Sequence, residues 1–85
     1  MGSEGALMMA IISLDTAPEG SEVKVLRISG GKNVMMRLLA MGVTPGSTIR
    51  VVSNKMRGPI VIEVRDVTIG IGRGIARKII VEAGK

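Results

Sequence analysis

Three groups of residues in this sequence have types and spacings that could carry chemistry: a glycine-rich segment, a few methionines close together and a pair of carboxylates. The chain has 85 residues and contains neither cysteine nor histidine. It therefore has no thiolate or imidazole nucleophile, and no side chain whose unperturbed pKa lies near neutrality. Because no acid–base or nucleophile constellation remains, the sequence predicts a protein that is not an enzyme.

The glycine-rich segment carries Gly70, Gly72 and Gly74 at the spacing of a phosphate-binding loop. Such a loop lies between a strand and a full helix, so that backbone N–H groups and the helix dipole point at the anion. The segment that follows here, Arg73–Ala76, is long enough for a single helical turn. We therefore interpret these glycines as residues of a tight turn.

The methionines and carboxylates are weak candidates for metal sites. Thioether sulfur prefers soft ions such as Cu(I), and helical periodicity places Met35 and Met41 in the core and Met36 on the surface. Glu63 and Asp66 are the closest carboxylates in a structured region, but two ligands alone bind a hard cation weakly. We expect no tight metal site and no bound cofactor.

The net charge of the chain is +5, from 12 Lys and Arg against 7 Asp and Glu. A basic balance is typical of proteins that bind nucleic acid, anionic lipid or an acidic protein, and it also suits a plain solvated surface. The chain has no Phe, Tyr or Trp, whereas bases of RNA and single strands usually stack on such rings. Nucleic acid is therefore not the expected partner.

The N-terminal residues 1–10 are predicted to be a flexible leader or to precede an alternative start at Met8 or Met9. The apolar stretch Ala6–Ile12 is far shorter than the roughly 20 residues that span a bilayer. No Lys or Arg precedes it, unlike in a signal peptide. We expect residues 11–85 to form a single domain located in the cytoplasm.

The middle of the chain predicts one strand and one short helix. In Glu22–Ile28 the apolar positions change parity after Val25, which predicts a bulge or a sharp bend. Residues Asn33–Met41 follow a helical period with one apolar side, with Asn33 as the N-cap and Gly42 as the C-terminal stop. A type II turn with Pro and Gly in its central positions is expected next.

The remaining segments alternate as strands do. They are Thr48–Ser53, Ile60–Arg65, Val67–Ile71 and Lys78–Glu82, with a tight reversal at Asp66. About five short strands, with one short amphipathic helix after the first, predict a mainly β protein built as a small SH3-like barrel. Closing the sheet into a barrel would leave few exposed strand edges.

Four segments in register resemble the FeoA family. The segment Arg37–Gly46 carries its Arg-Leu pair, Met-Gly helix stop and Pro-Gly turn, and Gly58-Pro59-Ile60 is similar to its next strand start. The stretch from Ile69 to Arg73 and the opening residues Leu14–Val25 also fit, so the likeness spans residues 11 to 82. The resemblance implies an SH3-like barrel that acts beside FeoB, the membrane ferrous-iron transporter with a cytosolic GTPase domain.

From this resemblance we expect a cytosolic accessory or regulatory protein of ferrous iron uptake that docks on FeoB. It would be peripheral to the membrane only through that partner, and self-association stays open. The expected docking face combines the helix and a basic loop: Met36, Arg37, Met41, Gly42, Lys55, Arg57 and Gly58. The alternatives are a nucleic-acid-binding barrel and a stand-alone relative of the C-terminal domain of DtxR-type repressors, which the family's module resembles.

Overall fold

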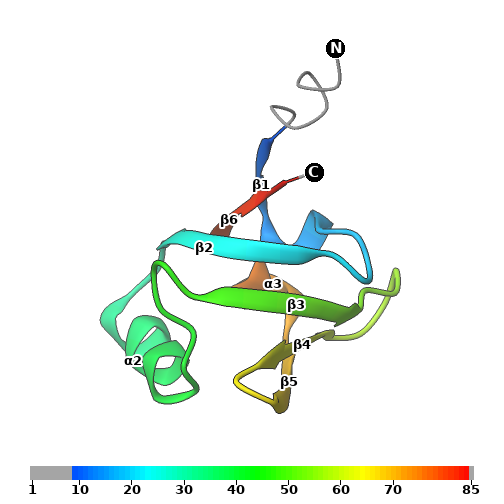
Figure 1. Cartoon of the computed structure of the whole chain (residues 1–85). Helices are drawn as coiled ribbons and strands as arrows, with labels where there is room; N and C mark the ends of the chain where they lie inside the picture. The colour runs from blue at the N-terminus through cyan, green and yellow to red at the C-terminus, as the bar shows by residue number, and fades with distance from the viewer. Residues whose placement is uncertain (1–8, 85) are drawn as a thin grey trace.

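The structure, a computed structural model, describes residues 9–84. Six strands form one antiparallel sheet in the order β1-β6-β2-β3-β4-β5, which wraps around a common interior (Figure 1). The strands are β1 (Ala10–Ser13), β2 (Glu22–Ile28), β3 (Thr48–Ser53), β4 (Ile60–Val64), β5 (Val67–Ile71) and β6 (Ile79–Ala83). The 3-10 turn η1 (Leu14–Thr16), the helix α2 (Lys32–Ala40) and the single turn α3 (Arg73–Ala76) connect them. The mainly β, SH3-like prediction is confirmed.

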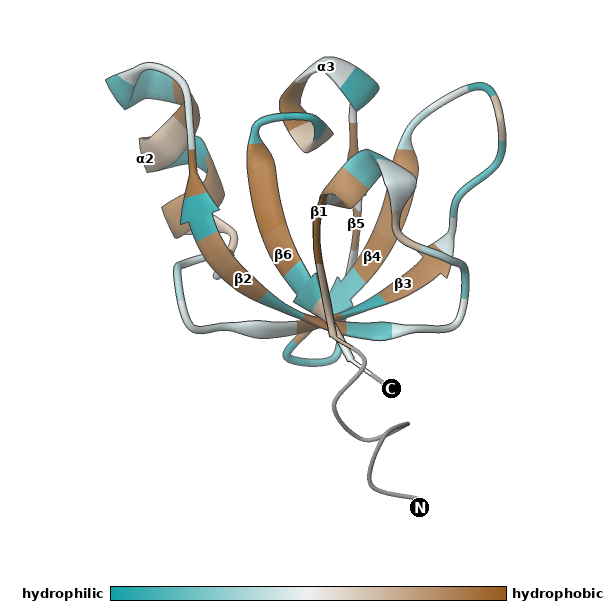
Figure 2. Cartoon of the chain, turned by 90° about the horizontal axis from the view of Figure 1, so that it is seen from above, coloured by the Kyte–Doolittle hydropathy of each residue, from teal (hydrophilic) through white to brown (hydrophobic). Residues whose placement is uncertain are grey.

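The interior is filled by aliphatic side chains that alternate along the strands. In β4 the buried residues are Ile60, Ile62 and Val64, and in β3 they are Ile49 and Val51, as the sequence predicts. Figure 2 shows brown, apolar stretches along β2, β3, β4 and β6, the strands that surround this shared interior. Because alternation buries one face of a strand only, the pattern fixes which way β3 and β4 face.

Two irregularities predicted from the sequence are present. The register between β2 and β6 shifts between Val25 and Arg27, which allows Val25 and Ile28 both to be buried. The segment after α2 closes a turn in which Ser47 N–H donates to the carbonyl of Thr44 at 2.9 Å, and Gly46 has a φ of +95°. A positive φ at that position is the signature of a type II turn.

The two ends of α2 differ from each other in how well they are capped. At the C-terminus, Gly42 donates to the carbonyl of Leu39 and Val43 donates to that of Leu38, both at 2.9 Å, which is a Schellman motif. At the N-terminus, the cap is Gly31 and no side chain caps the helix. The predicted cap at Asn33 is wrong, because the carbonyl of Gly31 already accepts the first helical hydrogen bond, from Met35.

The sequence did not predict strand β1. It pairs with β6 from Ala10↔Ala83 to Ser13↔Ile80, so Ala10, placed in the expected leader, is part of the sheet. Residues 1–8 of that leader lie outside the described residues. Within residues 9–84, no helix is long and apolar enough to cross a membrane.

The β4–β5 hairpin turns on two residues in the left-handed region, Arg65 at φ +50° and Asp66 at φ +67°. Val64 and Val67 pair on either side of this two-residue loop, as in a type I′ turn, which favours glycine at the second position. We expect Asp66→Gly to raise the free energy of unfolding by about 0.5–1 kcal/mol, because it relieves that backbone strain. Urea denaturation measures this change in the free energy of unfolding. Asp66→Ala is the matched control and should destabilise, and a neutral Asp66→Gly would contradict the assignment.

A candidate docking surface on helix α2

Helix α2 contacts the barrel along a narrow line and exposes most of its apolar residues. Its one fully buried side chain is Leu38, and Val34 is half-buried. Met35, Met36, Leu39 and Met41 at the helix end are 36%, 60%, 46% and 38% exposed. The prediction that Met35 and Met41 lie in the core is therefore wrong, whereas Met36 is on the surface as expected. We call these four side chains the α2 apolar surface.

Methionine is absent from the core of the described residues. Met9 and Met56 are also exposed, at 54% and 95%, and the core consists of Val, Ile, Leu and Ala. Flexible thioether side chains adapt to irregular partner surfaces, which is why methionine is common at adaptable binding sites. A short helix that presents three methionines and a leucine to solvent therefore has the composition of a protein-binding surface.

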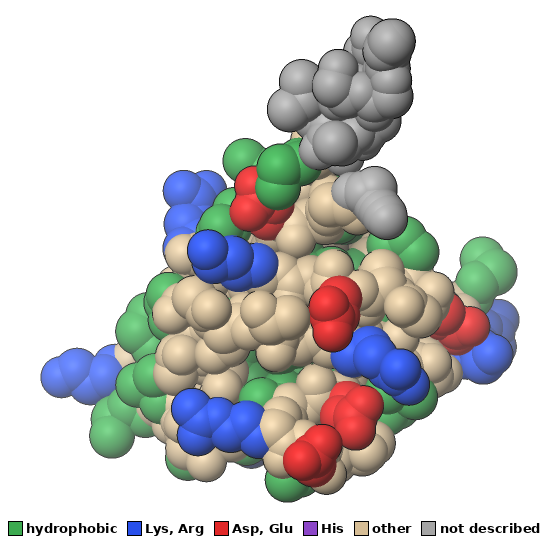
Figure 3. All heavy atoms as spheres, viewed as in Figure 1, with side chains coloured by type: hydrophobic (Ala, Val, Ile, Leu, Met, Phe, Trp, Pro, Cys, Tyr) green, Lys and Arg blue, Asp and Glu red, His purple; other side chains and the backbone are tan. Residues whose placement is uncertain are grey.

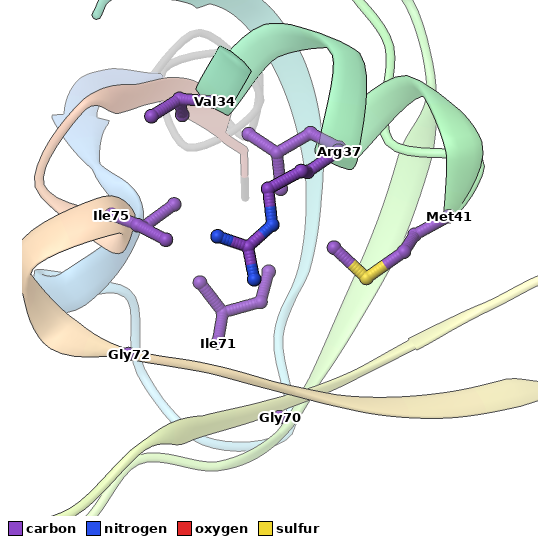
Figure 4. A pocket seen from close by; sticks show the side chains of 8 residues that line it. Val34, Arg37, Met41, Gly70, Ile71, Gly72 and Ile75 are labelled. Carbon is purple, nitrogen blue, oxygen red and sulfur yellow. The ribbon is translucent and has the colours of Figure 1, made fainter.

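A pocket of about 240 Å³ lies beside this surface, between α2, β5 and α3. Its apolar lining comes from Val34, Leu38, Met41, Ile71 and Ile75, together with backbone at two glycines, Gly70 and Gly72. Figure 4 shows the Arg37 side chain leaving α2 and extending across the pocket toward Ile71 and Ile75. The guanidinium thus lies among aliphatic groups.

The ion pairs found among the described residues do not include the arginine of α2. The ion pairs found in residues 9–84 join Arg50 to Glu63, Lys55 to Glu19 and Arg77 to Asp15, at 3.6, 3.4 and 3.8 Å. None of them involves Arg37. In Figure 3, blue basic and green apolar side chains lie on the α2 side of the visible face, whereas the opposite side carries red acidic and blue basic groups side by side.

The loop residues of the expected docking face lie elsewhere. Lys55, Arg57 and Gly58 belong to the β3–β4 loop, which Figures 1 and 2 both place on the side of the barrel opposite α2. The structure brings Met36, Arg37, Met41 and Gly42 together at α2 but separates them from this loop. The single face expected from the sequence is thus divided into two surfaces. Gly42 is half-buried at the helix stop, where its φ of +88° disfavours any other residue.

A polar cluster that sequence reasoning missed ties the β3–β4 loop to the barrel. The Asn54 amide nitrogen donates to the carbonyls of Asp15 and Ala17, at 3.1 and 2.6 Å. The Asn54 side-chain oxygen accepts from Arg73 Nη2 at 2.9 Å. Ser13 Oγ also donates to the Asp15 carboxylate. One asparagine thereby links η1, the loop and α3.

The Glu19 carboxylate extends this cluster and has a pKa below its ordinary value of 4.5, chiefly because the Asn54 backbone N–H donates to it at 2.7 Å, with Lys55 adding to the effect. A lowered folded-state pKa stabilises the fold above pH 4.5, and that contribution is lost as the pH falls through the folded value. We expect the Asn54 amide shift in NMR to stay constant above pH 5 and to move below pH 4.5. In Glu19→Gln the shift should stay flat, and movement there would contradict the assignment.

The other candidate chemistry takes structural roles. Gly72 is the N-cap of α3, and its carbonyl accepts from Ile75 and Ala76, so the glycine-rich segment forms the predicted turn. Glu63, which the sequence offered with Asp66 as a candidate cation ligand, forms an ion pair with Arg50. Among the described residues there is no group of three carboxylates placed to hold a metal ion. The α2 apolar surface and the pocket beside it offer a partner exposed apolar groups next to a concave site.

Comparison with known proteins identifies the family. A family model described as FeoA domain matches residues 12–83. The chain belongs to the FeoA family. A FeoA relative from Methanocaldococcus jannaschii, provisionally named Fe(2+) transport protein A, is 46% identical over 66 residues, which are 78% of this chain and 79% of that protein. The resemblance read from the sequence is confirmed.

Solved structures share the FeoA fold. The crystal structure of an iron uptake regulatory protein, FeoA, matches with a TM-score of 0.83 at 36% identity, over 87% of this chain and 99% of that one. A manganese-dependent transcriptional repressor matches with a TM-score of 0.79 at 22% identity, over 89% of this chain and 43% of the repressor. At that identity the repressor shows likeness of fold alone.

Proposed function

We propose that this FeoA-family chain is a non-enzymatic accessory protein of ferrous iron uptake, which regulates the FeoB transporter by docking on its cytosolic GTPase region. Two relatives with names that refer to Fe(2+) transport and iron uptake support the iron connection. The observation that carries the docking proposal is the α2 apolar surface, with Arg37 beside it.

The composition of this surface suits a protein partner. Interfaces draw most of their binding energy from a few large apolar side chains and arginines that become buried. The α2 apolar surface offers four such apolar groups on one short helix, and Arg37 lines the adjoining pocket together with one of them, Met41. Iron chelation by the chain itself has less support, because the carboxylates of the described residues form no cluster of three.

Regulation follows if the chain prefers one nucleotide state of the GTPase. A bound protein shifts a two-state equilibrium only by the difference between its affinities for the two states. The measurable property is therefore the dissociation constant with GDP divided by the dissociation constant with a GTP analogue. A ratio above one means that the chain binds the GTP state of the GTPase more tightly, and a ratio below one means that it binds the GDP state more tightly.

The test is a calorimetric titration of the chain into full-length FeoB in lipid nanodiscs, once with GDP and once with a GTP analogue. We expect Arg37→Glu and Leu39→Glu each to weaken binding about tenfold or more. Arg57→Glu is the matched control, because it makes the same charge change on the opposite side of the barrel and should alter binding little. Binding that survives both α2 variants but is lost in Arg57→Glu would refute docking through α2, and no binding at all would refute docking on FeoB.

A further inference from the structure

We propose that the pocket between α2, β5 and α3 receives an aliphatic side chain from an acidic peptide segment, and that Arg37 pairs with the carboxylate next to that side chain. This inference rests on the proposed function, because it specifies the chemistry that the docking partner must present. The occupant is a segment of another protein that carries a leucine or isoleucine beside Asp or Glu.

The shape and lining of the pocket select the aliphatic part of this ligand. Val34, Ile71 and Ile75 offer only hydrocarbon, and Leu38 closes the pocket toward the core. Gly70 and Gly72 add no side chains to the lining, and the space where a Gly72 side chain would start is open. A side chain that enters here would exchange water for hydrocarbon contacts, which favours binding in proportion to the apolar area covered.

The position of Arg37 selects the carboxylate. Its guanidinium extends over the apolar lining (Figure 4), and none of the ion pairs found in residues 9–84 includes it. Guanidinium matches a carboxylate with two parallel hydrogen bonds. Nearby apolar groups exclude water when a ligand covers them, and this strengthens the pairing.

Further cations at both ends of α2 extend the complementarity to a whole acidic segment. Lys32 begins the helix, the Lys78 side chain lies against Gly30 just before it, and the Arg65 side chain lies near Gly42 just after it. Acidic Asp66 at the hairpin offsets part of this charge. A segment with several carboxylates would meet these cations while it crosses the pocket.

Lys32 supports a binding role because it does not suit the helix. Cations are unfavourable at a helix N-terminus, where the helix dipole is positive. The first turn of α2 contains no Asp or Glu to offset the dipole. The charge at this position therefore works against the helix that carries it, as expected for a residue that serves an external anion.

The experiment is an NMR titration of the ¹⁵N-labelled full chain with three capped tetrapeptides: acetyl-Gly-Leu-Glu-Gly-amide, its Glu→Gln version and its Leu→Ala version. We expect the Leu-Glu peptide to shift the amides of α2, β5 and α3. The Gln version should bind about fivefold more weakly, and the Ala version about tenfold more weakly. In Arg37→Gln the Glu and Gln peptides should bind equally, whereas Arg57→Gln, the matched control, should keep the difference.

Three results would overturn the proposal: equal binding of the Glu and Gln peptides to the unaltered chain, equal binding of the Leu and Ala peptides, or shifts confined to the β3–β4 loop. Concentration-dependent shifts at the pocket without peptide would also overturn it, because the occupant would then be a second copy. Failure of the pocket is distinguishable from failure of the proposed function. If the peptides do not bind while FeoB binds through α2, the docking proposal stands and the proposed pocket chemistry is wrong. If the peptides bind while FeoB does not, the pocket chemistry stands and the proposed docking on FeoB is wrong.

Discussion

Leu38→Ala is expected to lower the free energy of unfolding by about 3 kcal/mol. The Leu38 side chain is 1% exposed and belongs to the core that also includes Val43, three residues after the last helical residue. Replacing a buried leucine by alanine loses the free energy gained when its methyl groups are transferred out of water, and it leaves a cavity. Stabilities of small domains are about 0.05–0.15 kcal/mol per residue, so the loss is a large fraction of the total. The melting temperature should fall by about 12–24 °C.

Helix α2 should also separate from the barrel in this variant. Leu38 is its one fully buried side chain, and a nine-residue helix is too short to be stable alone. Urea denaturation measures the stability, and circular dichroism measures the helix. Leu39→Ala is the matched control, because it makes the same change one residue later at a site 46% exposed. Equal losses from the two variants would contradict the packing described.

The second large effect is expected at Asn54. Asn54→Ala should lower the free energy of unfolding by about 2–3 kcal/mol, because it removes donors to two carbonyls and the acceptor of Arg73. The Nε atom of Arg73 is already buried without a hydrogen-bond partner. Losing the Asn54 oxygen would leave Nη2 without this acceptor as well, and unsatisfied buried donors are costly.

Asn33→Ala provides the control for that change. Asn33 is exposed on α2, and alanine is the better helix former, so this variant should be neutral or slightly stabilising. Thermal denaturation of the two variants, followed by circular dichroism, measures the difference. An Asn54→Ala protein as stable as the parent would contradict the stabilising role assigned to this asparagine.

Much of the fold could be predicted because its signals are local. Alternation predicted which residues of β3 and β4 face the core. The parity change after Val25 predicted the bulge, and Gly42 predicted the end of α2. Each of these depends on residues within a few positions of one another, where backbone preferences and periodicity act directly. The β4–β5 reversal at Asp66 was also predictable, since a two-residue gap between alternating runs leaves room for little else.

The docking surface and the polar cluster could be predicted only in part. Periodicity identified the apolar side of α2, but the width of the contact between helix and barrel decides how much of that side is buried. The barrel covers Leu38 and leaves Met35 and Met41 exposed. The partners of Asn54 lie 19 to 39 residues away in the sequence, so no local pattern reveals them. Strand β1 was missed because its four residues, Ala10–Ser13, continue an apolar run without alternation.

The pairing of β1 with β6 has a consequence for how this fold can be used. Ala10 and Ala83 are direct cross-strand partners, so the described fold begins and ends at one place, on the side of the molecule away from α2 (Figure 1). Domains joined before β1 or after β6 would therefore emerge together and leave the α2 pocket open. The geometry permits the barrel to be carried as a module within longer polypeptides, and the repressor of like fold is a longer chain, of which the match covers 43%.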